Sequence, residues 1–123
     1  MLVRLIGACR VAVGLLIIAR PRLAARLFAL PEAGATADAR FVTRIAGNRD
    51  LMLGAALLLA PAAQTPPLLG ACVAVDAADL LVALGSAGAS LRPRSVLSNV
   101  VVAGAAATGE FWALDRARRA RRF

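Results

Sequence analysis

Four long apolar segments, separated by turn signals, dominate the sequence. They lie at about residues 2–19, 39–60, 68–84 and 95–115. Each is about 17–22 residues long, close to what a helix needs to cross the hydrocarbon core of a bilayer. Pro21, Pro61 and the stretch GSAGAS (85–90) mark the breaks between them. The pattern predicts an all-α fold: one domain, residues 1–115, built as a bundle of four transmembrane helices.

The composition supports a membrane environment over a soluble one. Hydrophobic residues make up 60% of the 123-residue chain, against about 45–50% in ordinary soluble domains. A soluble helical bundle is the alternative, but its outer faces would then form a very large apolar patch. We therefore expect a multi-pass protein of the inner (plasma) membrane, with the lipid bilayer as its first partner.

A shorter amphipathic element is expected after the first span. In residues 22–30, RLAARLFAL, two arginines four positions apart alternate with leucine and phenylalanine. That spacing predicts a short helix lying in the membrane interface. Thr36 or Asp38 is placed to cap the helix that follows. We expect the N-terminal segment to be retained as the first helix, because Arg10 interrupts the apolar run that a signal peptide requires.

The positive charge points to a membrane surface. The formal net charge is +8, every basic residue is arginine, and five arginines fall in the basic tail, residues 116–123. Aromatic residues that could stack on bases are scarce, so nucleic acid is not an expected partner. A basic tail beside apolar helices is typical of an anchor on anionic lipid.

The orientation of the four spans is nearly balanced. Counting arginines gives six on the side of the 20–40 and 85–94 loops and six on the side of the termini. The dense cluster in the tail favours cytoplasmic termini slightly.

The sequence gives little support for a metal site or for a catalytic nucleophile. The chain has no histidine and no Cys-x-x-Cys pair, so neither a metal site nor a cofactor is expected. Cys9 and Cys72 lie in apolar stretches and are interpreted as small buried hydrophobic residues.

Polar residues are expected to gather in one layer inside the bundle. Counted from the loop side at about 1.5 Å per residue, five charged residues reach similar depth near mid-membrane: Arg10, Arg49, Asp50, Asp76 and Asp79. Asn48 lies alongside, and Arg44 and Asn99 lie nearer the surface. Charges at such depth cost a few kcal/mol each and are normally paired or turned to a cavity. We therefore expect one interior network, in which Gly7, Arg10 and Gly14 share a helix face.

Three interpretations of this layer stay open. In the first, Arg–Asp pairs fix the register of the helices. In the second, the layer forms the polar bottom of a ligand pocket, and Asp76 or Asp79 is a candidate catalytic acid. The candidate ligand-binding residues are Arg10, Arg44, Asn48, Arg49, Asp50 and Asn99. The third is a path for protons or ions. Glu110 and Trp112 are expected to mark a membrane interface.

A resemblance to a known family appears at these residues. Arg44, Gly47, Arg49, Asp50 and Gly54 form the pattern R-x-x-G-x-R-D-x-x-x-G, and a later D-x-x-D follows. From residue 10 to about residue 100 the chain resembles a family of small, uncharacterised four-helix membrane proteins of actinobacteria. Its architecture is also similar to that of the DoxX-like membrane proteins. The resemblance implies the fold and the membrane location, and it implies no activity.

The leading functional hypothesis is a membrane protein that binds a lipophilic small molecule. It would also catalyse acid-assisted cyclisation or isomerisation if Asp76 or Asp79 acts as an acid, so whether it is an enzyme stays open. The first alternative is a non-catalytic accessory subunit of a larger membrane complex, packed against a membrane protein partner or against further copies of itself. The second alternative is a small transporter.

Overall fold

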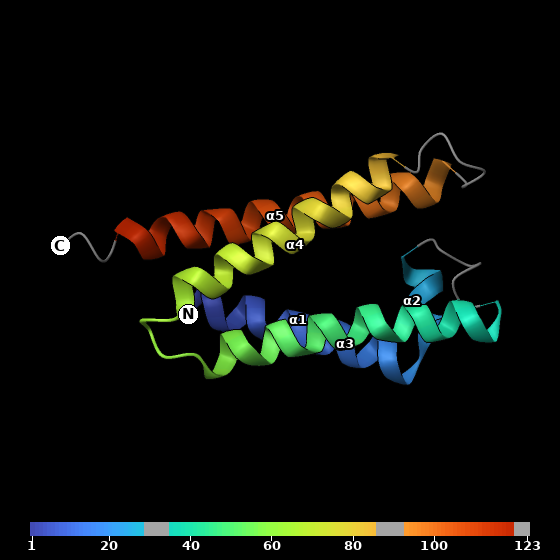
Figure 1. Ribbon diagram of the computed structural model, residues 1–123, viewed down its shortest axis with the longest axis horizontal. Coiled ribbons are helices and arrows are strands. Elements are labelled where there is room, and N and C mark those ends of the chain that lie inside the picture. The colour runs from blue at the N-terminus through green and yellow to red at the C-terminus, as the bar shows by residue number, and fades with distance from the viewer. Residues whose placement is uncertain (29–34, 86–92, 120–123) are drawn as a thin grey trace. The chain divides into compact units, whose positions relative to one another are not determined.

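The described residues of the chain form five α-helices. The computed structural model describes residues 1–28, 35–85 and 93–119, and within these ranges it contains no strand. The helices are α1 (Leu2–Ala19), α2 (Pro21–Leu27), α3 (Ala37–Leu59), α4 (Thr65–Gly85) and α5 (Pro93–Arg119) (Figure 1). The all-α prediction is therefore confirmed, with four long helices and one short one.

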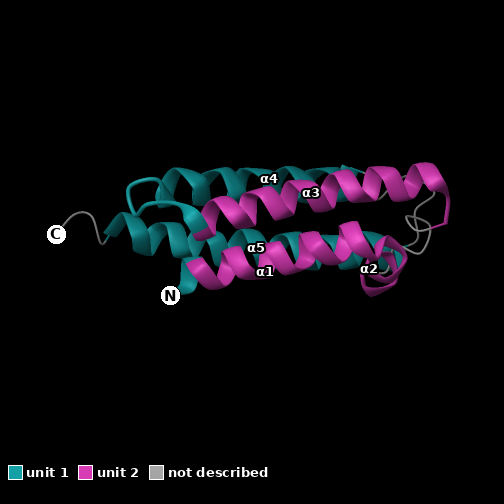
Figure 2. Cartoon of the chain, turned by 90° about the horizontal axis from the view of Figure 1, so that it is seen from below, with its two compact units in different colours: residues 1–3, 59–123 teal, residues 4–58 magenta. Residues whose placement is uncertain are grey.

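The helices form two compact units, shown in separate colours in Figure 2. One unit, Arg4–Leu58, contains α1, α2 and α3. The other, Met1–Val3 with Leu59–Phe123, contains α4 and α5. Each unit therefore has one pair of long helices.

Local chemistry explains where three of the helices begin. Pro21 opens α2, a position where the missing amide proton of proline costs nothing. The Thr36 hydroxyl accepts a hydrogen bond of 3.1 Å from the amide of Ala39. Of the two residues expected to cap α3, Thr36 and Asp38, it is therefore Thr36 that does so. Pro66 and Pro67 lie in the first turn of α4, where proline is tolerated.

Helices α4 and α5 pack on each other along their length. Leu69, Cys72 and Asp76 form one buried stripe on α4, spaced three and four residues apart. The buried residues of α5 are Ser95, Glu110, Ala113 and Leu114. Figure 1 shows α5 continuing past the first turn of α4. The two helices have 27 and 21 residues, or about 40 and 31 Å at the usual rise.

Among the residues that the structure describes, three of the four long helices are apolar enough and long enough to cross a membrane. These are α1, α4 and α5. Helix α3 does not match the expectation of four such helices by composition: it is 23 residues long but carries Arg44, Arg49 and Asp50 within its apolar stretch. Its length alone was enough to predict a helix.

Several helix boundaries differ from the expected ones; α4, for example, begins at Thr65 rather than at about residue 68. The short helix α2 has seven residues and ends at Leu27; of the expected range 22–30, residues 29 and 30 lie outside the described part of the chain. Helix α5 runs on to Arg119 and so includes the first half of the expected tail, because Asp115 and Arg119 form an i,i+4 ion pair of 2.8 Å. Residues 120–123 of the tail and 86–92 of the last loop also lie outside the described residues.

Candidate functional site

The centre of the α1–α3 pair contains an ion pair. The Nη1 atom of Arg10 donates a hydrogen bond of 2.7 Å to Oδ1 of Asp50. The two side chains are only 10% and 17% exposed. A charged hydrogen bond of this length, in a largely buried place, is of the strong kind. The equal depth expected for Arg10 and Asp50 from counting along the helices thus corresponds to direct contact.

Four glycines surround this ion pair and allow the two helices to approach closely. They are Gly7 and Gly14 on α1 and Gly47 and Gly54 on α3, each seven residues from its neighbour. A Cβ atom at position 14 would lie 2.6 Å from the carbonyl oxygen of Gly47. A Cβ at position 54 would lie 2.7 Å from the carbonyl oxygen of Gly7. Since real Cβ contacts of this length do not occur, only glycine fits at these crossings.

The ion pair therefore lies between two crossings where the backbones touch. Gly7 opposes Gly54 on one side of it, and Gly14 opposes Gly47 on the other. A shift of α1 along α3 would break the Arg10–Asp50 hydrogen bond and drive side chains into the positions of the glycines. The arrangement fixes the register of the two helices, which favours the structural interpretation of these two residues.

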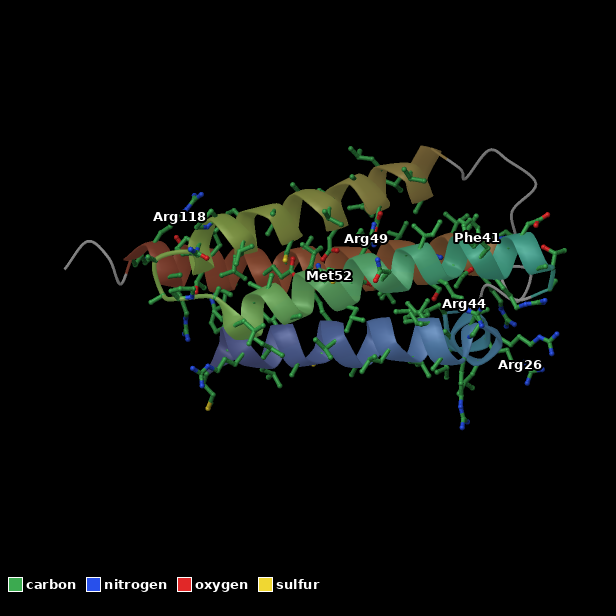
Figure 3. The ribbon with its side chains drawn as sticks, turned by 60° about the horizontal axis from the view of Figure 1, so that its bottom comes forward. Arg26, Phe41, Arg44, Arg49, Met52 and Arg118 are labelled. Atoms are coloured by element: carbon green, nitrogen blue, oxygen red, sulfur yellow. The ribbon has the colours of Figure 1, made fainter. Side chains whose placement is uncertain are left out.

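The three remaining candidate residues of α3 have different surroundings. Arg49 Nη2 lies 3.8 Å from Asp50 Oδ1, with its side chain 37% exposed. Arg44 donates from Nε to the carbonyl oxygen of Ile18 at 3.2 Å, near the end of α1 and beside α2 (Figure 3). Asn48 is exposed. It follows Gly47 directly, and the step of about 100° per residue turns it away from the face that packs on α1.

Asp76, Asp79 and Asn99 belong to the unit that contains α4 and α5. Asp76 is 5% exposed, whereas Asp79, one turn further along α4, is half-buried. Asn99 donates from Nδ2 to the carbonyl oxygen of Ser95 at 2.9 Å, so one side of its amide bonds within α5. The structure thus brings Arg10, Arg49 and Asp50 together, and a network that includes the aspartates of α4 stays a prediction.

Glu110 is a second buried carboxylate, only 2% exposed. That it marks a membrane interface beside Trp112 stays a prediction. Trp112 itself is 47% exposed. The signal for Glu110 was present in the sequence, since Glu110 and Ala113 lie three residues apart on one buried face of α5. The two neighbouring positions Glu110 and Trp112 therefore point to different surroundings.

The two cysteines lie in different surroundings. Cys9 and Cys72 do not form a disulfide; Cys72 is buried, but Cys9 is exposed, against the expectation that both are buried. Within the described part of the chain, no group of three His, Cys, Asp or Glu side chains lies close enough together to hold a metal ion.

Comparison with known families decides the classification. The model of a domain of unknown function, DUF4267, matches residues 7–109. The chain belongs to this family. The match includes all four glycines and both members of the Arg10–Asp50 pair, and it agrees with the resemblance to an uncharacterised family. No curated protein and no solved structure matches the chain.

Proposed function

We propose that the protein is an integral membrane protein in which α3 enters the bilayer together with α1. The Arg10–Asp50 ion pair of 2.7 Å supports this. An unpaired arginine or aspartate at the middle of a membrane helix costs about 3 kcal/mol on insertion scales. Pairing satisfies both charges inside the helix interface, so α3 contributes less polar surface to the lipid than its sequence suggests. This gives four inserted helices in the inner (plasma) membrane.

Membrane insertion is tested by fractionation. The protein should sediment with membranes and should stay there after extraction with alkaline carbonate, which removes peripheral proteins. Recovery in the supernatant without detergent would overturn the proposal. A glycosylation or cysteine-labelling tag placed in the 61–64 turn reports on which side that turn lies, and so tests whether both α3 and α4 cross.

Within the membrane, the function that we propose is binding of a lipophilic small molecule through Asp76. The observation that carries this is the burial of Asp76, 5% exposed, on a helix apolar enough to cross a membrane. Ionisable residues are rare at such positions and are by default candidates for functional sites. A carboxyl group there can hydrogen-bond a hydroxyl, carbonyl or amine of a ligand whose remaining surface is apolar.

The second carboxylate of α4 and the Arg10–Asp50 pair have different roles in this proposal. Asp79, half-buried one turn away, is the second candidate acid for a cyclisation or isomerisation of the bound molecule. The Arg10–Asp50 pair is assigned to helix register, because it lies between the two crossings at which the glycines of α1 and α3 oppose one another. The ligand is therefore proposed to contact α4 rather than this pair.

The test is extraction of the molecule that copurifies with the protein. Wild type, Asp76→Asn, Asp79→Asn and the control Asp38→Asn are purified in a mild detergent, and lipophilic molecules are quantified by mass spectrometry. Asp38 is exposed in the first turn of α3. A species stoichiometric with wild type should be lost from Asp76→Asn and kept in Asp38→Asn. Equal recovery from all four proteins would overturn the proposal, provided that each accumulates in the membrane.

A second candidate function, an accessory subunit, is favoured by one face of α3. Phe41, Ile45, Asn48 and Met52 are all exposed and follow each other at spacings of four, three and four residues. Figure 3 shows Phe41 and Met52 on this helix. The spacing is that of a helix-packing seam, and an asparagine within a seam hydrogen-bonds across to another helix rather than to lipid.

Purification also tests the accessory role. A partner chain should copurify at fixed stoichiometry and should be lost from Asn48→Leu. The matched control is Thr108→Val on α5, because the exposed Thr108 hydroxyl already donates to the carbonyl oxygen of Gly104 at 2.7 Å. A monodisperse single chain from wild type would count against the accessory role, and a dimer of this chain would assign the seam to self-association.

A further inference from the structure

The C-terminal end of α5 combines aromatic and basic side chains on one face. Trp112, Arg116 and Arg119 are spaced four and three residues apart, so they follow one another along the helix surface. The guanidinium carbon of Arg116 lies 3.8 Å from the centroid of the Trp112 ring. All three residues are exposed. We call this set the α5 terminal cluster.

The geometry of α5 brings this cluster to the surface of a membrane. The helix is 27 residues long, about 40 Å, while the hydrocarbon core is about 30 Å thick. Its partner α4 has 21 residues, about the thickness of the core. The last turns of α5, which continue past α4 in Figure 1, must therefore lie among the lipid headgroups. Tryptophan is enriched at this depth.

The stacking prepares Arg116 for binding a phosphate. A guanidinium group lying over an indole ring is held by the electrostatic attraction of the ring, and its N–H donors remain in its own plane. Such a planar fork fits two oxygens of one phosphate. The Arg119 Nε atom lies 2.8 Å from Asp115 Oδ2, which orients this second guanidinium while its two terminal nitrogens have further donors.

We propose that the α5 terminal cluster binds the headgroup phosphate of anionic phospholipids. Charge complementarity selects this partner: Arg118 adds a third exposed cation at the same end (Figure 3), and basic residues in the last turn also oppose the negative end of the helix dipole. The consequence is a topology in which the C-terminus faces the anionic cytoplasmic leaflet. This inference is independent of ligand binding at Asp76.

Trp112 provides the probe, because it is the only tryptophan of the chain. The full-length protein is placed in nanodiscs of phosphatidylcholine with one-fifth phosphatidylglycerol. In one sample the acyl chains of phosphatidylcholine carry bromine, and in the other those of phosphatidylglycerol. Bromine quenches Trp112 fluorescence, so the two samples together give the equilibrium constant for exchange of one lipid for the other at this site. Each arginine near the surface is expected to contribute roughly a fivefold preference for the anionic lipid.

The wild type should therefore show a preference of roughly 5- to 25-fold, and this preference should fall on raising NaCl from 50 to 500 mM. The double variant Arg116→Gln, Arg119→Gln should fall close to 1. The control Arg22→Gln, Arg26→Gln removes two charges from α2, and should keep the wild-type value. The double variant Arg116→Lys, Arg119→Lys keeps the charge without the planar guanidinium fork and should show an intermediate preference for the anionic lipid.

The proposal is overturned by any of three results. One is a wild-type preference close to 1, and another is an equal loss in the α2 control. The third is a lysine variant with the full preference, which would exclude phosphate binding by the stacked fork. A short DNA duplex added to nanodiscs of pure phosphatidylcholine should leave Trp112 fluorescence unchanged at physiological salt; tight binding of the duplex would also overturn the lipid assignment.

Discussion

Replacing Gly14 by alanine should destabilise the α1–α3 pair. The new Cβ would lie 2.6 Å from the carbonyl oxygen of Gly47, 2.6 Å from the amide nitrogen of Leu51 and 2.9 Å from its Cα. All three atoms are backbone, so no side-chain rotation can relieve the contact. The helices must move apart by about 0.8–1 Å to restore ordinary van der Waals distances.

The size of the effect follows from two opposing contributions. Overpacking in a tight interface costs about 1–3 kcal/mol, and the upper end applies because backbone atoms cannot turn aside. Alanine in place of glycine within a helix recovers about 1 kcal/mol. The net destabilisation is about 2 kcal/mol, or roughly a 30-fold change in the ratio of folded to unfolded protein. The separation also stretches the Arg10–Asp50 hydrogen bond, whose present length is 2.7 Å.

The measurement is unfolding in mixed micelles. Helix content is followed by circular dichroism while sodium dodecyl sulfate is titrated into protein in dodecyl maltoside. Gly70→Ala is the matched control, since no heavy atom of the described residues lies within 4 Å of a Cβ at that position; it should gain up to about 1 kcal/mol. The two variants should therefore move the midpoint in opposite directions. A Gly14→Ala protein as stable as the wild type would refute the close approach of the backbones.

Two further substitutions test the ion pair and the cap. Arg10→Met or Asp50→Leu alone should destabilise by about 3–5 kcal/mol, because each leaves a largely buried charge without its partner at 2.7 Å, whereas the double variant should recover most of the loss. Membrane accumulation and the same titration measure these effects, and single variants as stable as the double variant would contradict the expectation. Thr36→Ala should cost about 1 kcal/mol at the start of α3, measured as faster hydrogen exchange at the Ala39 amide. Thr108→Ala, which removes no cap, should leave that exchange rate unchanged.

Much of the fold could be predicted because its determinants are local. Proline and glycine mark the helix ends, and the Thr36 cap follows from one hydroxyl near one amide. Counting the rise along antiparallel helices placed Arg10 and Asp50 at the same depth, and they form an ion pair. Depth is a property of position along the chain, so a sequence alone can give it.

Angular position around a helix was harder to predict. Asn48 was expected alongside the interior layer, yet it lies about 100° around the axis from the packed Gly47 and is exposed. Glu110 was expected to mark a membrane interface from its charge and from nearby Trp112, and neither signal indicates that its side chain is buried. The partner of a helix face is a tertiary property. Arg116 posed the same difficulty, since its stack on Trp112 depends on α5 continuing beyond Asp115.

The Arg10–Asp50 pair also has a consequence for synthesis of the chain. With the proposed membrane insertion, Arg10 would leave the ribosome well before its carboxylate partner, and α1 would reach the translocon with this charge not yet paired. α1 is apolar enough to insert with this charge, whereas α3 is not among the helices that qualify by composition alone. An already inserted α1 would then present the guanidinium and glycine face onto which α3 folds. The first helix would act as the intramolecular chaperone for the third.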